Sequence, residues 1–320
     1  MGGEEAAMRN YVVQRILATL PVMGVVVLFV FLLLRLVPGD PAALIAGDYA
    51  TSEDIAKIRV ALGLDKPVHV QLGLWLAALA RGDLGTSIYS KLPVTHLMAQ
   101  RLEPTLALTL TTLVFAVSLA VPLGVLAAWK AGTWVDRAVM ILAVAGFSLP
   151  VFWLGFLFIY GFSIKLALLP VQGFVSVTEG VVPFLQHLVL PTLTLGTVYM
   201  ALIARITRAS ILEVLSQDYI RTAHAKGVAQ LQVLWRHALK NAAVPVVTVI
   251  GIGVALLIGG VVVTESVFAI PGLGRLTVDA ILHRDYPVIQ GIILVFSAVY
   301  VLINLLVDLS YTMLNPRIRY

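Results

Sequence analysis

The chain has 320 residues, of which 60% are apolar and only 12% are charged, and its formal net charge is +5. A soluble domain carries about 25% charged residues, so this composition indicates a protein that lies mostly in lipid. The basic residues form no clustered face with aromatic side chains, which argues against nucleic-acid binding. The absence of cysteine excludes disulfides, thiolate metal sites and thiol catalysis.

Six apolar segments are long enough to cross a bilayer, because about 20 helical residues span a hydrocarbon core of about 30 Å. They lie at residues 16–34, 105–128, 138–162, 188–205, 243–263 and 288–309. Backbone groups in lipid must be hydrogen-bonded within the segment, so we expect each one to be a helix. The predicted fold class is an all-α polytopic membrane protein with six transmembrane helices.

The segment at 16–34 is predicted to be a retained helix rather than a signal peptide. Its apolar run is too long for the hydrophobic part of a signal peptide, and no small-x-small cleavage site follows it. The glutamates before Met8 are unusual flanks for such a helix, which leaves Met8 open as an alternative start.

Lysine and arginine in the short loops predict that both termini lie in the cytoplasm. With that orientation the inner segments hold most of the cations, including six from Arg205 to Lys240. The short outer loops hold only Lys165, Arg275 and Arg284. The segment at 37–104 is long enough to be translocated regardless of its charge.

An extracytoplasmic helical element is expected after the first span, where VPGDP at 37–41 ends the helix. Residues 51–62 indicate a short helix capped by Thr51 or Ser52, and residues 68–82 have apolar positions at helical spacing. We therefore divide the chain into three parts: 1–94, the first span and this element; 95–312, a five-helix membrane domain; and 313–320, a cytoplasmic tail.

A polar, basic stretch interrupts the apolar chain at 218–227, DYIRTAHAKG, within the large loop at 209–241. Ser216 or Asp218 is expected to cap a helix there. Four positions fall on one face of that helix: Tyr219, Ile220, Ala223 and Gly227. Gly227 can adopt a positive φ and turn the chain into a second helix at 228–241. An amphipathic helix with a small-residue face and a sharp end suits docking into a groove on a partner protein.

A basic helix lying on anionic lipid is the alternative interpretation of the same stretch. That interpretation calls for large Leu, Phe or Trp side chains on the buried face. Residues 218–227 offer alanine, glycine and one tyrosine instead, which favours a protein socket.

The same region resembles the cytoplasmic coupling motif of ATP-binding-cassette (ABC) importer permeases. RTAHAKG at 221–227 and RHALKNAAVPV at 236–246 are similar to the variant found in the dipeptide and oligopeptide permeases. The generic motif has Glu-Ala-Ala where this chain has Arg221, Thr222 and Ala223, and its distal proline is displaced here to Pro245. Further matching motifs are LVPGDP at 36–41, LGLDKP at 62–67, GDLGTS at 82–87, FSLPVFWLG at 147–155, ESVFAIPGLGRL at 265–276, RDYPVIQG at 284–291 and NPRIR at 315–319.

These motifs follow in order along nearly the whole chain, so the resemblance is specific to the B-type subunit of the dipeptide/oligopeptide family, which also includes nickel and glutathione importers. One departure is Asn315, where the family commonly has Asp, and it puts an ion pair with Arg317 in doubt. The resemblance implies the type I importer fold. It also implies a coupling role for six residues: Tyr219, Arg221, Ala223, Ala225, Lys226 and Gly227.

The resemblance implies that the chain works with other subunits: a second homologous permease, two ABC ATPase subunits and an extracytoplasmic solute-binding protein. This chain has no G-x-x-x-x-G-K-[ST] phosphate loop, so we expect no cofactor on it, with ATP and Mg held by the ATPase subunits. Closure of the ATPase pair would push the helix around 219–227 and switch an inward-facing cavity to an outward-facing one. Peptides are the expected solute, with nickel complexes, glutathione or oligosaccharides as alternatives.

Other residues are candidates for the translocation path or a gate. Pro150 is expected to kink the third span beside Ser148 and Phe152, which either line the path or pack in the core or against lipid. Glu265 opens a loop that we interpret as an outer gate, where it either pairs with a cation such as Arg275 or touches solute. Asp308 is expected to make a structural polar contact with a neighbouring helix rather than to bind solute.

Two further patterns concern glycine and histidine residues. Glycines 251, 253, 259 and 260 indicate close helix packing rather than nucleotide binding, because they lie inside an apolar span. Six scattered histidines with no H-x-x-x-H spacing predict no metal site.

Two rival functions have weaker support. A secondary transporter would show an internal repeat and interrupted helices that carry ion ligands, and neither is visible. A membrane enzyme would need a catalytic constellation, and no nucleophile–base pair stands out.

Overall fold

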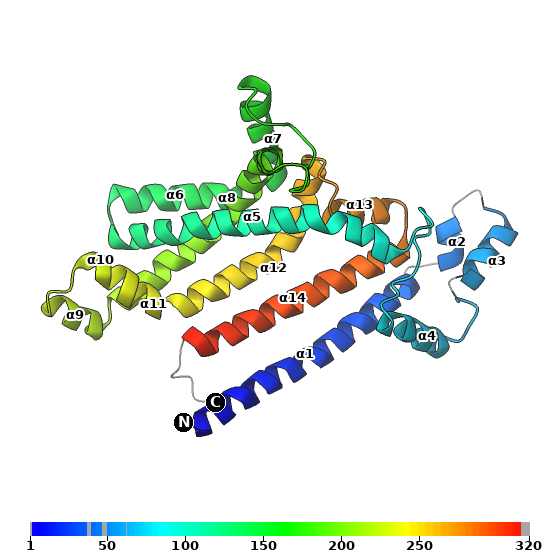
Figure 1. Ribbon diagram of the computed structural model, residues 1–320, viewed down its shortest axis with the longest axis horizontal. Coiled ribbons are helices and arrows are strands. Elements are labelled where there is room, and N and C mark those ends of the chain that lie inside the picture. The colour runs from blue at the N-terminus through cyan, green and yellow to red at the C-terminus, as the bar shows by residue number, and fades with distance from the viewer. Residues whose placement is uncertain (1, 37–39, 47–49, 62, 315–320) are drawn as a thin grey trace. The chain divides into compact units, whose positions relative to one another are not determined.

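The computed structural model describes residues 2–36, 40–46, 50–61 and 63–314 of the chain. Within that part the regular secondary structure consists of sixteen helical elements, joined by turns and loops, and one isolated β-bridge links Thr86 and Pro93 (Figure 1). They are α1 (Gly2–Leu36), α2 (Pro41–Ala46), α3 (Ser52–Ala61), α4 (Val68–Ala80), α5 (Val94–Trp129), α6 (Trp134–Ser148), α7 (Val151–Phe158), η1 (Ile159–Lys165), α8 (Val181–Leu215), α9 (Asp218–Ala225), α10 (Gln230–Gln232), η2 (Val233–Ala238), α11 (Leu239–Asn241), α12 (Ala243–Val267), α13 (Leu273–Leu282) and α14 (Tyr286–Leu314).

Five of the described helices are long and apolar enough to cross a membrane: Val13–Leu33, Val94–Trp129, Val181–Leu215, Ala243–Val267 and Tyr286–Tyr311. A sixth crossing is obtained if the bent pair Trp134–Ser148 and Val151–Lys165 is one span. The predicted all-α membrane fold is therefore confirmed, and the six predicted spans correspond to these five helices and the bent pair.

The third span differs from the kinked but continuous helix expected at 138–162, because it breaks and bends by 105°. Leu149 is extended, with φ −88° and ψ 133°, and Pro150 has ψ 135°. A proline disfavours the helical conformation of the residue before it and has no N–H to continue the ladder. The break lies where Pro150 was expected to act, and α7 with η1 projects from the rest of its unit (Figure 1).

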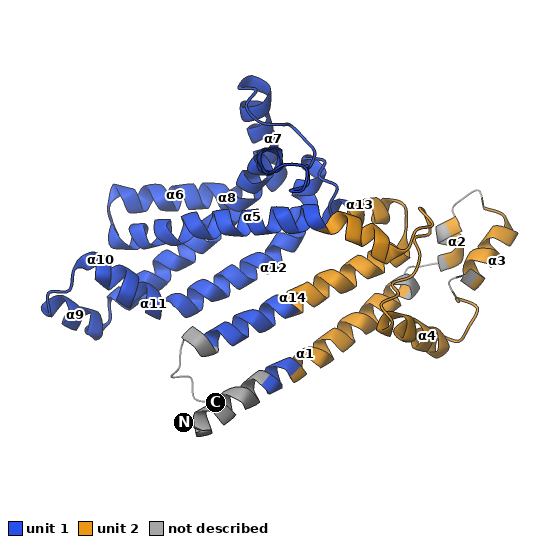
Figure 2. Cartoon of the chain, in the orientation of Figure 1, with its two compact units in different colours: residues 1–16, 103–275, 302–320 blue, residues 17–102, 276–301 orange. Residues whose placement is uncertain are grey.

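The chain forms two compact units, coloured separately in Figure 2. Unit 1 comprises residues 1–16, 103–275 and 302–320, and unit 2 comprises residues 17–102 and 276–301. The boundaries fall inside α1, α5, α13 and α14, so each of these helices contributes to both units.

The core of unit 1 lies where α5, α8 and α12 pack together, around buried residues such as Leu195, Tyr199 and Leu257. Glycines allow this approach: a Cβ on Gly260 would lie 2.6 Å from Leu195 Cδ1, and one on Gly251 would collide with Val307. Close packing is thus confirmed for these glycines and for Gly253, which faces Tyr199, while Gly259 has no such neighbour within 4 Å.

Unit 2 contains the short helices expected after the first span. Thr51 caps α3, because its hydroxyl accepts a hydrogen bond from the Asp54 N–H at 3.3 Å. The same hydroxyl donates to the Asp54 carboxylate at 2.6 Å, and this donated bond lowers the pKa of the Asp54 carboxyl. Arg59 donates to Asp40 at 2.5 Å and likewise lowers the pKa of that carboxyl. The expected helices at 51–62 and 68–82 are confirmed as α3 and α4.

Candidate functional site

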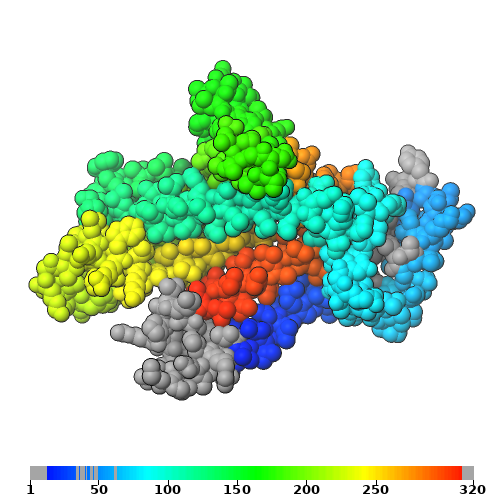
Figure 3. Space-filling view, viewed as in Figure 1, coloured from blue at the N-terminus to red at the C-terminus, as the bar shows by residue number. Residues whose placement is uncertain are grey.

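The basic stretch folds as expected into a short helix, α9, followed by a sharp turn. Only Ile220 of this helix is buried, with 2% of its surface exposed, while Tyr219, Arg221 and Lys226 are exposed. The helix starts after the extended residue Gln217, and no side chain caps it, so neither Ser216 nor Asp218 acts as the expected cap. In the space-filling view the segment that contains α9 and α10 forms an exposed end of unit 1 (Figure 3).

Gly227 ends α9 in the left-handed conformation, with φ +73°. Its N–H donates to the His224 carbonyl at 2.9 Å, and the Val228 N–H donates to the Ala223 carbonyl at 3.2 Å. This pair of bonds is a Schellman turn, which satisfies carbonyls that the helix end leaves free. The expected positive φ at Gly227 is confirmed, and no atom lies within 4 Å of the position a Cβ would take.

Residues 228–241, which follow Gly227 in the loop at 209–241, connect α9 to the membrane helices. They run through α10, η2 and α11, and η2 is a π-helix, a form frequently found at functional sites. Leu234 and Ala238 of η2 join a buried apolar cluster with Val125 of α5 and Ile211 of α8. Because η2 also contacts α9, α9 is connected through η2 to these two long helices.

The exposed face of α9 differs in part from the small-residue face predicted from the sequence. Ile220 turns inward and Ala223 is half-buried, because this side of α9 packs toward η2. The surface left for a partner is formed by the exposed residues of the stretch at 218–226: Asp218, Tyr219, Arg221, Thr222, His224, Ala225 and Lys226.

The chemistry of this face is polar and weakly basic. Arg221 approaches Asp218 at 3.3 Å, but both side chains are highly exposed, so the pair contributes little to stability. Partial desolvation raises the pKa of the Tyr219 hydroxyl, which keeps it neutral and able to donate. Such a face can form hydrogen bonds and ion pairs with an acidic or polar groove.

A buried ion pair braces the helices next to this segment. Arg208 of α8 donates to both carboxylate oxygens of Asp136 at the start of α6, at 2.5 and 2.8 Å, and the Gly132 N–H donates at 2.9 Å. Asp136 is almost completely buried. Sequence reasoning missed this pair, although an aspartate at the start of an apolar helix was a usable signal.

Glu265, the expected gate residue, is fully buried at the end of α12. The Thr105 hydroxyl of α5 donates to it at 2.6 Å, and the backbone N–H of Arg275 donates at 2.9 Å. The Thr105 oxygen in turn accepts the Leu273 N–H at 2.8 Å. Glu265 thus contacts Arg275 through the backbone, and Thr105 is a partner that sequence reasoning did not identify.

Asp308 makes the structural contact that was expected. Arg15 of α1 lies 3.0 Å from its carboxylate, and both residues belong to unit 1. The pair holds the end of α14 to α1.

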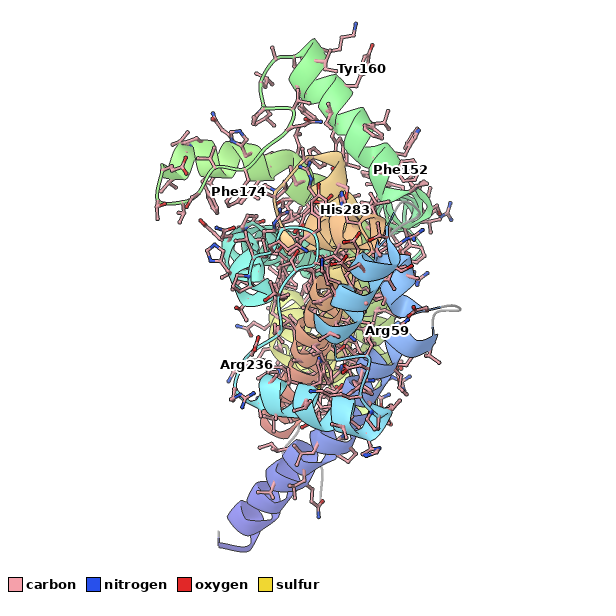
Figure 4. All side chains as sticks on the ribbon, turned by 90° about the vertical axis from the view of Figure 1, so that its right-hand side faces the viewer. Arg59, Phe152, Tyr160, Phe174, Arg236 and His283 are labelled. Carbon is pink, nitrogen blue, oxygen red and sulfur yellow. The ribbon has the colours of Figure 1, made fainter. Side chains whose placement is uncertain are left out.

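Ser148, Pro150 and Phe152 lie together at the break between α6 and α7, and all three are exposed. Phe152 and Tyr160 lie along the projecting part formed by α7 and η1 (Figure 4). The prediction about Asn315 and Arg317 concerns residues outside the part of the chain that the structure describes.

Unit 2 holds two recesses. One of about 630 Å³ is lined by Phe31, Trp75 and Tyr286 together with Lys66 and Lys91. A smaller one of about 320 Å³ lies beside α13 and is lined in part by Leu276, Asp279 and Ala280. Among the described residues no group of three histidine or acidic side chains could hold a metal ion.

Comparison with known proteins gives two family matches that together cover most of the chain. Residues 8–109 match the N-terminal part of the binding-protein-dependent transport system membrane component, and residues 120–320 match the binding-protein-dependent transport system inner membrane component.

Several curated proteins are similar over nearly the full length. The probable peptide ABC transporter permease protein y4tP of Sinorhizobium fredii (strain NBRC 101917 / NGR234) is 54% identical over 310 residues, covering 97% of this chain and 99% of that protein. The glutathione transport system permease protein GsiC of Escherichia coli (strain K12) is 47% identical over 313 residues, covering 98% of this chain and 100% of that protein.

Among solved structures, the methionine ABC transporter MetNI in an inward-facing conformation matches with a TM-score of 0.58 at 19% identity, over 69% of this chain and 97% of that chain. This likeness supports the type I importer fold. The family matches and the membrane-spanning helices agree on one conclusion: the chain belongs to the multi-pass inner-membrane permease components of binding-protein-dependent ABC transport systems.

Proposed function

We propose that this chain is one permease subunit of an ATP-driven importer that moves peptides or a related small solute into the cell, with ATP hydrolysed by separate subunits. The observation that carries the proposal is α9, a short exposed helix that ends at Gly227 and is mounted on α5 and α8 through a buried cluster. A helix so placed is suited to receive a push from outside the chain and pass it to the membrane helices.

The proposed assembly contains a second homologous permease, two ABC ATPase subunits and an extracytoplasmic solute-binding protein. Family membership implies ATPase and binding-protein partners, and the stoichiometry is part of the proposal. ATP and Mg would bind to the ATPase subunits, and this chain would hold no cofactor. Both termini and α9 would then lie in the cytoplasm, as the distribution of lysine and arginine predicts.

The six residues expected to couple to the ATPase keep that role in the proposal, with a refinement. Tyr219, Arg221, Ala225 and Lys226 would contact the partner, because they are exposed. Ala223 would lie on the side of α9 that packs toward η2, and Gly227 would end the helix. The segment from Ser148 to Phe152 would border the translocation path, whereas Glu265 and Asp308 would act through their internal contacts.

Peptides are the proposed solute because a relative 54% identical to this chain is named as a probable peptide permease and another as a glutathione permease, glutathione being itself a tripeptide. Nickel complexes and oligosaccharides are the alternatives. Specificity would reside largely in the binding protein.

The test is ATP-dependent uptake of a labelled dipeptide by proteoliposomes that contain the complete assembly, with unlabelled glutathione as competitor. Uptake that needs both ATP and the binding protein supports the proposal, and competition by glutathione would widen the solute class. Equal uptake without the ATPase subunits would contradict it and would favour a secondary transporter.

A further inference from the structure

The coupling segment, defined as α9 to α11 (residues 218–241), is joined to Glu265 by one continuous helix, α12. The segment ends with α11 at Asn241, and α12 begins at Ala243. Glu265 lies 22 residues further along α12, or about 33 Å at 1.5 Å per residue. The two features therefore lie near opposite ends of the same helix (Figure 1).

Glu265 and Thr105 together cap the start of α13. The first N–H groups of a helix have no partners within the helix, and those of Leu273 and Arg275 are satisfied by Thr105 and Glu265. The hydroxyl of Thr105 accepts from Leu273 and donates to Glu265, so it links α5, α12 and α13 in one hydrogen-bonded chain. A negative charge at a helix N-terminus is also favourable.

The space around this cap is closed. A Cβ on Gly274 would lie 2.9 Å from a Glu265 oxygen and 2.6 Å from the Val262 Cα, and a Cβ on Gly272 would collide with the Glu265 carboxylate. The PGLG sequence at 271–274 therefore lets the chain pass directly over the buried carboxylate.

Strained turns flank α13 on both sides. Five described helices end in a Schellman turn, and α3, α4 and α9 place a glycine at the left-handed position: Gly63, Gly82 and Gly227. The turns before and after α13 place Ala269 at φ +49° and Arg284 at φ +54° instead. A non-glycine residue in this conformation costs free energy and persists only where surrounding contacts hold it.

A second buried carboxylate holds the chain just after α13. The Asp285 carboxylate accepts a hydrogen bond from the Ser87 hydroxyl. It also accepts hydrogen bonds from two backbone groups, the Ile88 N–H at 3.1 Å and the Tyr89 N–H at 3.4 Å. Asp285 is 4% exposed and lies in unit 2, whereas Glu265 lies in unit 1. The unit boundary falls inside α13, between Arg275 and Leu276.

We propose that Thr105 and Glu265 are positioning residues that transmit movement of α12 to α13, and so link the coupling segment to the chain that enters unit 2. This inference rests on the proposed function. A rigid α12 that tilts at its coupling end carries Glu265 with it, and the capped first turn of α13 follows because its hydrogen bonds end on Glu265 and Thr105.

The test compares Thr105→Val with Thr105→Ser in the complete reconstituted assembly. Valine keeps the shape but removes the hydroxyl, and serine keeps the hydroxyl. We expect Thr105→Val to lower the stimulation of ATP hydrolysis by loaded binding protein at least fivefold, with basal ATP hydrolysis and assembly unchanged. Thr105→Ser should stay within twofold of the unmodified complex.

Stimulation retained in Thr105→Val would overturn the inference, and so would an equal loss of basal and stimulated hydrolysis, which indicates a merely structural role. Hydrogen exchange in the unmodified complex gives a readout that needs no variant. Exchange of the Leu273 and Arg275 amides should change between the nucleotide-free and ATP-bound states, and identical protection would count against transmission. Absence of ATP-dependent uptake by the unmodified complex would instead refute the proposed function.

Discussion

Helices α9 and α13 are both short and both end in a Schellman turn, but they are held in place in different ways. In α9 the left-handed residue is Gly227, no side chain caps the start, and most of the surface is exposed. In α13 the left-handed residue is Arg284, and its start is capped by Glu265 and Thr105 from other parts of the chain.

The contrast separates a helix that is specified locally from one that is specified by distant contacts. α9 depends on its own sequence and on packing toward η2, where Ile220 is buried, and it leaves a polar face for another molecule. α13 is fixed at both sides by buried carboxylates, and its free energy is tied to α5 and α12. A helix of the first kind suits contact with a partner, and one of the second kind suits transmission within the chain.

The largest expected effect comes from breaking the support after α13. Asp285→Ala leaves the Ser87 hydroxyl and two backbone N–H groups without their charged acceptor, which should lower the free energy of unfolding by about 3 kcal/mol. Thermal unfolding of the purified protein in detergent measures it. Asp285→Asn keeps one acceptor oxygen, so its free energy of unfolding should fall by less. An unchanged midpoint of thermal unfolding in Asp285→Ala would show that Asp285 does not hold this segment.

The next effect is expected at the end of α9. Gly227→Leu has room for its side chain but must adopt φ +73°, which costs roughly 1–2 kcal/mol. We expect solute uptake to fall about tenfold while the amount of the variant in the membrane stays normal, because a cost of about 1.4 kcal/mol corresponds to a tenfold change in an equilibrium constant. Gly227→Asn is the matched control because asparagine tolerates this conformation. Normal uptake by the leucine variant would argue against coupling through this turn.

A comparable effect should follow from disturbing the exposed face of α9. Ala225→Arg places a much larger, charged side chain in the proposed interface, and its volume and desolvation should weaken co-purification of the ATPase subunits about tenfold. Ala223→Arg should also weaken recovery, but through displacement of α9 from η2. Unchanged recovery with both variants would favour a helix that lies on lipid.

The smallest effect has the opposite sign. Arg284→Gly removes the left-handed strain at the end of α13 and should stabilise the protein by up to about 1 kcal/mol. Arg221→Gly, in the interior of α9, should destabilise it by about 1 kcal/mol because glycine is a poor helix former. Equal shifts of the unfolding midpoint in the same direction for Arg284→Gly and Arg221→Gly would contradict the view that α9 and α13 are held in place in different ways.

The same distinction explains how much the sequence alone could predict. Span positions follow from apolar length, the helix at 218–225 from its periodicity, and its end from Gly227. The family resemblance followed from motifs such as RTAHAKG. These signals are all local, and they were sufficient for the fold class and for the position of the candidate site.

What the sequence could not predict depends on partners far along the chain. Glu265 and Thr105 are 160 residues apart, and Ser87 and Asp285 are 198 apart, so neither cap leaves a local pattern. For the same reason no helix was predicted in the loop after Glu265, where α13 lies. The inward turn of Ile220 depends on η2, and the 105° bend at Pro150 depends on how α7 packs, whereas proline alone indicates only a break.

Site-specific cross-linking from α9 tests the central claim most directly. The chain has no cysteine, so a single cysteine at Ala225 can carry a photoactivatable cross-linker in the complete assembly. The account predicts an adduct with the ATPase subunit, and none from a control cysteine at Trp134, which is 78% exposed on α6. Transport-competent complexes that give only lipid adducts from position 225 would contradict it.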